Sequence, residues 1–344
     1  MVQALKKELI LEKPYLGHQK ITSIYFGGGT PSLLTENEIE ALLETIHRNY
    51  EVEPGAEITL EANPDDIATT ALRSWKNAGI NRLSIGVQSF FEEELRWMNR
   101  AHNAAHAREC IELSLAEGFN NVTIDLIYGS PLLTDEMWKI NVDTATSFGI
   151  PHLSCYALTV EEKTPLHKKV AELSVPDVEN EKQARQFLLL MQWLKEKGYE
   201  HYEVSNFAKP EMRSRHNSSY WKGSPYLGIG PSAHSYNGKE RRWNIANNNI
   251  YIRNINEGAP EREKEILSLE NKINEAIMIG LRTMEGLNLD VFEQLYGVEE
   301  RSRLQNELKK FISQRWIVMN KSSAYLTEQG MLVADGVAAS LFRG

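Results

Sequence analysis

Cysteine is scarce in this chain of 344 residues, which contains only Cys110 and Cys155. Their number and spacing suit neither a disulfide framework nor a metal-binding loop, and we expect a cytoplasmic protein in which both are buried as small hydrophobic groups. Long apolar runs are also missing. The longest, residues 187–194, is interrupted by Gln192, and the charged, amphipathic N-terminus is not typical of a signal peptide. The net charge of −9 argues against a broad surface for nucleic acid or anionic membranes.

Strand and helix patterns alternate through the first 160 residues. Strands are expected over 21–26, 57–62, 82–87, 122–128 and 152–158, with helices over 36–49, 68–78, 104–117 and 135–147. Units of about thirty residues predict parallel strands joined by right-handed crossovers. The fold class is therefore α/β, and the pattern alone leaves open a doubly wound sheet or a βα-barrel.

Residues suited to ligand binding stand at the ends of these strands. The first strand runs into Gly27-Gly28-Gly29-Thr30, where bare backbone can approach a ligand and present its N–H groups. Glu61, Gln88 and Asp125 follow on the next three strands. One such carboxylate alone would more often cap a helix. Because the carboxyl ends of parallel strands meet at one rim, the combination favours a shared binding cavity.

The motifs at these positions identify a family. The segments Tyr25-Phe26-Gly27-Gly28-Gly29-Thr30-Pro31-Ser32, Glu61-Ala62-Asn63-Pro64, Gly86-Val87-Gln88-Ser89-Phe90, Asn99-Arg100 and Asp125-Leu126-Ile127-Tyr128-Gly129 resemble the radical S-adenosylmethionine (SAM) family that contains oxygen-independent coproporphyrinogen III oxidase. The resemblance covers nearly the whole chain. It implies that SAM is bound through its methionyl amino group by Gly28, Gly29 and Thr30, through its polar end by Glu61, Gln88 and Arg100, through its ribose by Asp125 and through its adenine by Ala157.

A later segment resembles one branch of that family. His216-Asn217-Ser218-Ser219-Tyr220-Trp221 is similar to the signature of the heme chaperones, as is the stretch 228–235. The resemblance implies a protein that carries heme to membrane-bound hemoproteins. Two alternatives remain open: oxidative decarboxylation of coproporphyrinogen III to protoporphyrinogen IX in porphyrin biosynthesis, and a non-catalytic module that binds heme or protein.

Heme requires an axial ligand and a flat apolar surface, and the region around these motifs offers both. His216 is the first candidate ligand, with His201 and His234 as alternatives and Tyr220 and Trp221 as flanking aromatic groups. For any single histidine, ordinary packing and backbone hydrogen bonding are the competing interpretation.

The sequence departs from the family at the iron–sulfur cluster. The family holds a [4Fe–4S] cluster on a Cys-x-x-x-Cys-x-x-Cys loop that precedes the glycine motif, and this sequence has no such triplet. We therefore expect an incomplete (β/α)6-type barrel without the first strand and the cluster loop. Without thiolate ligands, the chain as given is expected to perform no radical chemistry, so its status as an enzyme is open. An exposed barrel edge would favour a homodimer.

Three domains are expected, at 1–175 (partial barrel), 176–265 (barrel-closing region) and 266–344 (C-terminal domain). Helical patterns at 273–281, 289–296 and 302–314, with a hairpin over 316–319 and 324–326, resemble a winged helix. Because the chain is acidic and has no arginine-rich recognition helix, a lid or a partner-docking module is a better interpretation than DNA binding.

Overall fold

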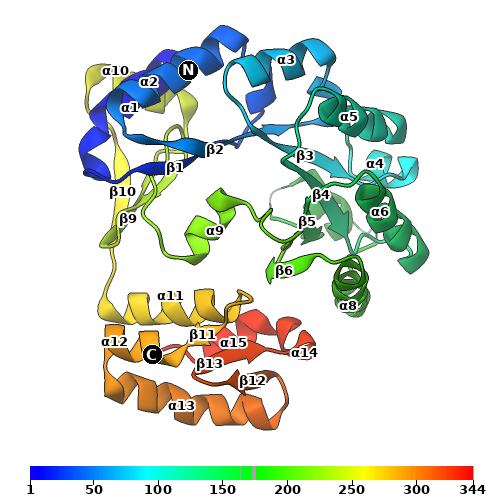
Figure 1. Cartoon of the computed structure of the whole chain (residues 1–344), viewed down its shortest axis with the longest axis vertical. Helices are drawn as coiled ribbons and strands as arrows, with labels where there is room; N and C mark the ends of the chain where they lie inside the picture. The colour runs from blue at the N-terminus through cyan, green and yellow to red at the C-terminus, as the bar shows by residue number, and fades with distance from the viewer. Residues whose placement is uncertain (163, 173–175, 344) are drawn as a thin grey trace.

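The computed structural model describes residues 1–162, 164–172 and 176–343 (Figure 1). Its main element is a seven-stranded sheet in the order β1-β2-β3-β4-β5-β7-β6. The first five strands are parallel, and β7 and β6 continue the sheet in antiparallel pairing. The strands span Ile21–Phe26, Val52–Ala62, Arg82–Gln88, Val122–Tyr128, His152–Ala157, Glu200–Glu203 (β6) and Asn206–Ala208 (β7).

The sheet curls around α9 (Arg215–Trp221), and the other helices of this part of the chain cover its outer face (Figure 1). The apolar faces of these helices and the sheet enclose the largest core, which includes Trp75, Trp138 and Phe207. The outer helices are α2 (Glu36–Asn49), α3 (Thr69–Asn77), α4 (Glu92–Trp97), α5 (Ala104–Ala116), α6 (Asp135–Ser147) and α8 (Asn180–Glu196), and the short helix α7 (Pro165–Ala171) follows β5 in the chain. The expected α/β partial barrel is therefore confirmed, with β1 and β6 as its two edges in the described part of the chain.

Local sequence explains where these elements begin. Thr35 and Glu38 form a reciprocal capping box at the start of α2. Strand β2 starts at Val52, five residues earlier than expected. The dipeptide Pro54-Gly55 is typical of a turn, so the sequence pattern indicates a strand only from residue 57. The chain instead bulges there: Ile21 pairs with Val52, whereas Ser23 already pairs with Glu57.

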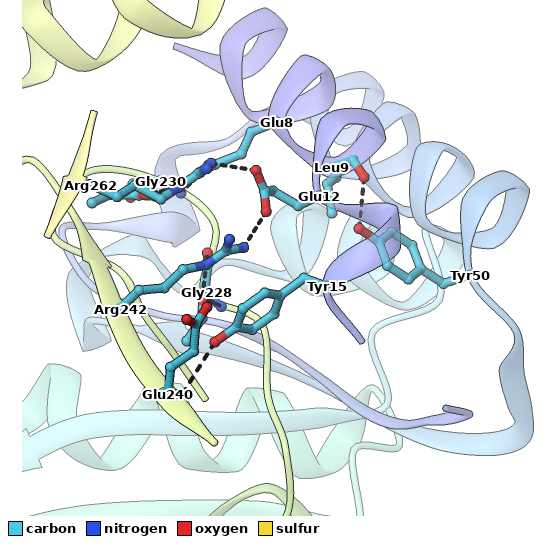
Figure 2. A network of polar contacts seen from close by, with 12 residues as sticks. Glu8, Leu9, Glu12, Tyr15, Tyr50, Gly228, Gly230, Glu240, Arg242 and Arg262 are labelled. Carbon is cyan, nitrogen blue, oxygen red and sulfur yellow. Dashed lines mark hydrogen bonds and ion pairs between the residues drawn. The ribbon is translucent and has the colours of Figure 1, made fainter. Parts of the chain in front are cut away.

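A second, three-stranded sheet of order β10-β9-β8 lies beside β1, and the sequence patterns did not predict it. Its strands are His234–Tyr236 (β8), Glu240–Asn244 (β9) and Arg262–Ile266 (β10), with α10 (Asn248–Glu257) between the last two. Helix α1 (Val2–Leu11) lies between this sheet and the barrel. Buried Glu8 on the helix and buried Glu12 just after it bind residues of β9 and β10 (Figure 2).

The C-terminal part has its own core and a three-stranded sheet, β11-β13-β12. The expected three helices and hairpin are confirmed as α11 (Leu269–Leu281), α12 (Leu289–Tyr296), α13 (Val298–Ser313), β12 (Ile317–Asn320) and β13 (Ser323–Leu326). Strand β11 (Leu287–Asn288) and helices α14 (Glu328–Met331) and α15 (Ala334–Ser340) complete it. The three-domain division stays a prediction, and its first boundary falls on residues 173–175, outside the described residues. Among the described helices, none is both long and apolar enough to cross a membrane.

Candidate functional site

Glu61, at the end of β2, is held in place from two sides. The hydroxyl of Tyr25 donates to Oε1 of Glu61 over 2.7 Å, and the backbone N–H of Gly28 donates to Oε2 over 3.1 Å. Gly27 allows this arrangement, because a Cβ at that position would lie 2.5 Å from the Tyr25 ring and 2.9 Å from Oε1 of Glu61. Gly28 and Gly29 adopt φ values of 72° and 65°, in the left-handed region that favours glycine. The glycine turn and Glu61 thus form one polar corner.

A second polar corner is built at the end of β3. Arg100 donates from Nη2 to Oδ1 of Asn63 over 2.9 Å and to the carbonyl of Gly86 over 3.2 Å. Its Nε is buried and has no hydrogen-bond partner in the described structure. Gln88 lies in the same corner. Its side-chain nitrogen packs so closely on Gly86 that a Cβ atom added at position 86 would be only 2.9 Å away from it. An arginine with an unsatisfied N–H matches a carboxylate ligand, because guanidinium can donate to both oxygens.

Asp125 projects into the barrel from β4. The pKa of Asp125 is raised to about 7, mainly by burial. A hydrogen bond with Ser154 acts to lower this pKa, and the negative charge of Glu61 acts to raise it. Ser84 lies 3.4 Å from Oδ1 of Asp125. Ala157 is exposed at the end of β5, the neighbouring strand. A carboxyl group that titrates near neutrality can both donate to and accept from a ligand hydroxyl.

A groove of about 1040 Å³ runs along the free edge of β1. Six of the predicted site residues line it: Gly28, Thr30, Glu61, His216, Tyr220 and His234. The groove therefore joins the glycine corner to part of the histidine- and aromatic-rich region. Gln88, Arg100, Asp125, Ala157, Gly29, His201 and Trp221 are not part of its lining.

His216 lies inside the barrel because α9 is anchored there. The carboxylate of Glu57 on β2 accepts hydrogen bonds from the backbone N–H groups of Arg215 (3.1 Å) and His216 (3.0 Å) and from Ser214 Oγ (3.3 Å). The His216 ring stacks on Tyr25 at 4.5 Å, with Nδ1 3.2 Å from Ser23 Oγ and Nε2 3.2 Å from the Tyr220 hydroxyl. Burial lowers the pKa of His216 to about 4, so its imidazole is neutral at pH 7, with both ring nitrogens within hydrogen-bond distance of a hydroxyl group.

The other candidate histidines lie elsewhere. His201 stacks on Phe207 at 4.2 Å, and its Nε2 is 3.1 Å from the carbonyl of Val204; burial lowers its pKa to about 4. His234 is an exposed residue on β8 that stacks on Trp243. The structure thus brings together His216 and Tyr220, adds Tyr226 at 4.8 Å from Tyr220, and separates His201 from this group.

The residues present do not fit an iron–sulfur cluster. Cys110 is buried on α5 and Cys155 is buried on β5. Burial raises the pKa of the Cys110 thiol to about 12 and also raises that of Cys155, which opposes the thiolate form that a cluster requires. Within residues 1–162, 164–172 and 176–343, no three His, Cys, Asp or Glu side chains gather closely enough to hold a metal ion.

Several important residues were missed by sequence reasoning. Tyr25, Gly27 and Asn63 belong to the quoted motifs and lie next to the strand ends, so the sequence could have indicated them as site residues. Glu57 and Ser23 gave no signal, because their partners on α9 are more than 150 positions away in the sequence.

Comparison with known proteins defines the class first. The Radical SAM superfamily model matches residues 2–144, and the HemN C-terminal domain model matches residues 267–333. The solved structure of coproporphyrinogen III oxidase (HemN), a radical SAM enzyme from Escherichia coli, superposes with a TM-score of 0.84. That match has 22% identity and covers 99% of this chain and 82% of that one. At this identity the structural likeness establishes the fold.

The sequence relatives then specify the family. Heme chaperone HemW of Bacillus subtilis is 33% identical over 98% of this chain and 89% of its own length. Heme chaperone HemW of Mycobacterium tuberculosis (strain H37Rv) is 34% identical over 98% of this chain and 85% of its own length. The chain belongs to the HemN-like radical SAM family, in the group of HemW heme chaperones. The predicted family is confirmed.

Proposed function

We propose that this protein is a heme chaperone that takes heme into the groove beside β1 through His216 and passes it to hemoproteins, including membrane-bound ones. The observation that carries the proposal is the arrangement of His216, Tyr220 and Tyr226 at this groove. A neutral imidazole would supply the axial nitrogen, and the tyrosine rings, which meet each other edge to face at 75°, would supply apolar surface beside it. The relatives named HemW support the same function.

A hemin titration followed by visible absorbance tests this proposal. Wild-type protein should give a saturable Soret shift, and His216→Ala should weaken hemin binding by about tenfold or more, because the axial nitrogen is lost. His106→Ala is the matched control: His106 is an exposed histidine on α5 and should leave the titration unchanged. Identical curves for wild type and His216→Ala would contradict His216 as the ligand.

We infer that the polypeptide also retains a site for SAM. Gly28, Glu61 and Arg100 would hold its methionine end, with the Arg100 guanidinium turned toward the carboxylate so that its buried, unpartnered Nε gains a hydrogen bond, and Asp125 would accept from a ribose hydroxyl. In the family, SAM bound at a cluster supplies a radical after reductive cleavage. The two buried cysteines of this chain cannot hold that cluster, so we propose binding of SAM without its cleavage.

Anaerobic reconstitution with iron and sulfide tests the absence of radical chemistry. After desalting, the protein should contain no stoichiometric iron and sulfide, and dithionite with SAM should release no 5′-deoxyadenosine. Isothermal titration of the same sample with SAM should still give a binding isotherm that Arg100→Ala weakens. A stoichiometric [4Fe–4S] cluster would overturn this part of the proposal.

The oxidase alternative makes a separate prediction about products. Its support is the fold shared with the E. coli enzyme, at 22% identity. Conversion of coproporphyrinogen III to protoporphyrinogen IX would favour it, whereas hemin transfer to an apo-hemoprotein without that conversion favours the chaperone.

A further inference from the structure

Asp66 connects the two polar corners described above. It is the last residue of a short 3-10 helix, η3 (Pro64–Asp66), which begins shortly after β2. The Oδ2 atom of Asp66 accepts from Ser32 Oγ over 2.6 Å and from Nδ2 of Asn63 over 3.3 Å. Ser32 belongs to the loop that follows the glycine turn, and Asn63 accepts from Arg100. One carboxylate oxygen therefore contacts side chains of both corners.

The contact with Asp66 determines which way the side-chain amide of Asn63 faces. A guanidinium group only donates hydrogen bonds, and an ionised carboxylate only accepts them. Arg100 therefore requires the amide oxygen of Asn63, which lies 2.9 Å from its Nη2, and Asp66 requires the amide nitrogen. Turning the amide over would place two donors together at Arg100 and two acceptors together at Asp66. Asp66 thus selects the amide orientation that Arg100 needs.

The amide of Asn63 in turn holds the Arg100 guanidinium. Nη2 of Arg100 donates to Asn63 and to the carbonyl of Gly86, whereas its buried Nε has no hydrogen-bond partner in the described structure. A carboxylate can accept from two N–H groups of a guanidinium at once, and this arrangement is geometrically specific. Contacts that hold Nη2 therefore influence how well Arg100 can bind a carboxylate.

Capping of a helix does not account for Asp66. The two hydrogen-bond partners of its side chain in the described structure are side chains, whereas a capping carboxylate accepts from backbone N–H groups. Asp65 stands beside it on the same short helix and is exposed. Oδ1 of Asp65 lies 3.9 Å from Nδ1 of His102, which is beyond hydrogen-bond distance. The two neighbouring aspartates thus differ in their contacts with the site.

We propose that Asp66 is a positioning residue for the carboxylate of SAM. It acts through Asn63 on Arg100, and through Ser32 it ties the loop after the glycine turn to the same point. This role rests on the proposed SAM site and adds a requirement to it. Recognition of the carboxylate needs a hydrogen-bond acceptor at position 66, whereas recognition of the rest of SAM does not.

Isothermal titration with two ligands tests this role. The probes are SAM and decarboxylated SAM, which keeps the sulfonium, the amino group and the adenosine but lacks the carboxylate. Asp66→Ala should weaken SAM binding by about tenfold, because Arg100 loses its orientation, and should change binding of decarboxylated SAM by less than about twofold. Asp66→Asn retains an accepting oxygen and should bind SAM nearly as wild type does. Asp65→Ala is the matched control and should change neither titration.

The outcomes separate the role of Asp66 from the SAM site itself. Equal losses for both ligands in Asp66→Ala, full SAM affinity in that variant, or an Asp66→Asn variant as weak as Asp66→Ala would each overturn the role of Asp66. Wild type that binds neither ligand would overturn the SAM site as well. Urea unfolding tests the contacts without ligand: the losses for Asp66→Ala and Arg100→Ala should be smaller in the double variant than their sum, and additive losses would contradict the coupling.

Discussion

Replacing Glu57 with glutamine is expected to reduce the free energy of unfolding by about 3–5 kcal/mol, the usual cost of removing one partner of a buried ion pair. Glu57 lies 3.7 Å from Nε of Arg82, and both side chains are almost fully buried. The loss would leave the Arg82 charge without a counter-ion. It would also remove the carboxylate that accepts hydrogen bonds at the N-terminus of α9. The midpoint of urea unfolding, followed by circular dichroism, measures the change.

Two further variants separate these causes. Glu57→Gln combined with Arg82→Met removes both charges, so it should recover part of the loss. Glu44→Gln breaks the exposed pair between Glu44 and Arg48 and should cost at most about 0.5 kcal/mol. Because α9 carries His216, Glu57→Gln should also weaken hemin binding. A Glu57 variant as stable as the Glu44 variant would show that the buried pair does not hold the barrel and α9 together.

The regular part of the fold was predictable because local patterns specify it. The strands at 21–26 and 122–128 and the helices at 36–49 and 135–147 have the expected bounds, since buried strands and capped amphipathic helices have strong periodic signals. The sheet of β8, β9 and β10 was missed for the opposite reason. These strands are three to five residues long, and β9 and β10 are rich in charged residues, so they lack the alternation that marks a strand.

Some residues of the candidate site were likewise predictable from local patterns, and others were not. Glu61 and Gln88 stand on strands that the sequence pattern already predicted, so their common rim followed from topology. The position of His216 depends instead on Glu57, Tyr25 and Ser23, which are far away in the chain. His201 precedes Tyr202 directly, and His216 lies four residues before Tyr220. Only tertiary contacts distinguish the histidine packed on Phe207 from the one at the groove.

Asp125 should make the protein less stable as the pH rises from about 4 to 7. The pKa of this carboxyl is about 7 in the folded protein, raised by burial from a usual value near 3.8. The folded state therefore holds the proton more tightly than the unfolded state, so its contribution is fully present below pH 4 and is lost as the pH rises through 7. Three pKa units correspond to at most about 4 kcal/mol, and solvent entering the barrel reduces this.

Asp125→Asn mimics the protonated carboxyl and isolates this effect. Between pH 4 and 7, the unfolding free energy of wild type should fall relative to that of Asp125→Asn. Above pH 7, the difference between the two should stay constant. Asp135 is a control of opposite sign, because a hydrogen bond from Arg185 lowers its pKa. For Asp135→Asn, the difference should shift in favour of wild type as the pH rises through the lowered pKa. Parallel pH profiles for wild type and Asp125→Asn would mean that Asp125 is already ionised in the empty barrel. A carboxylate, and not a neutral acid, would then be the group that accepts from the ribose hydroxyl of SAM.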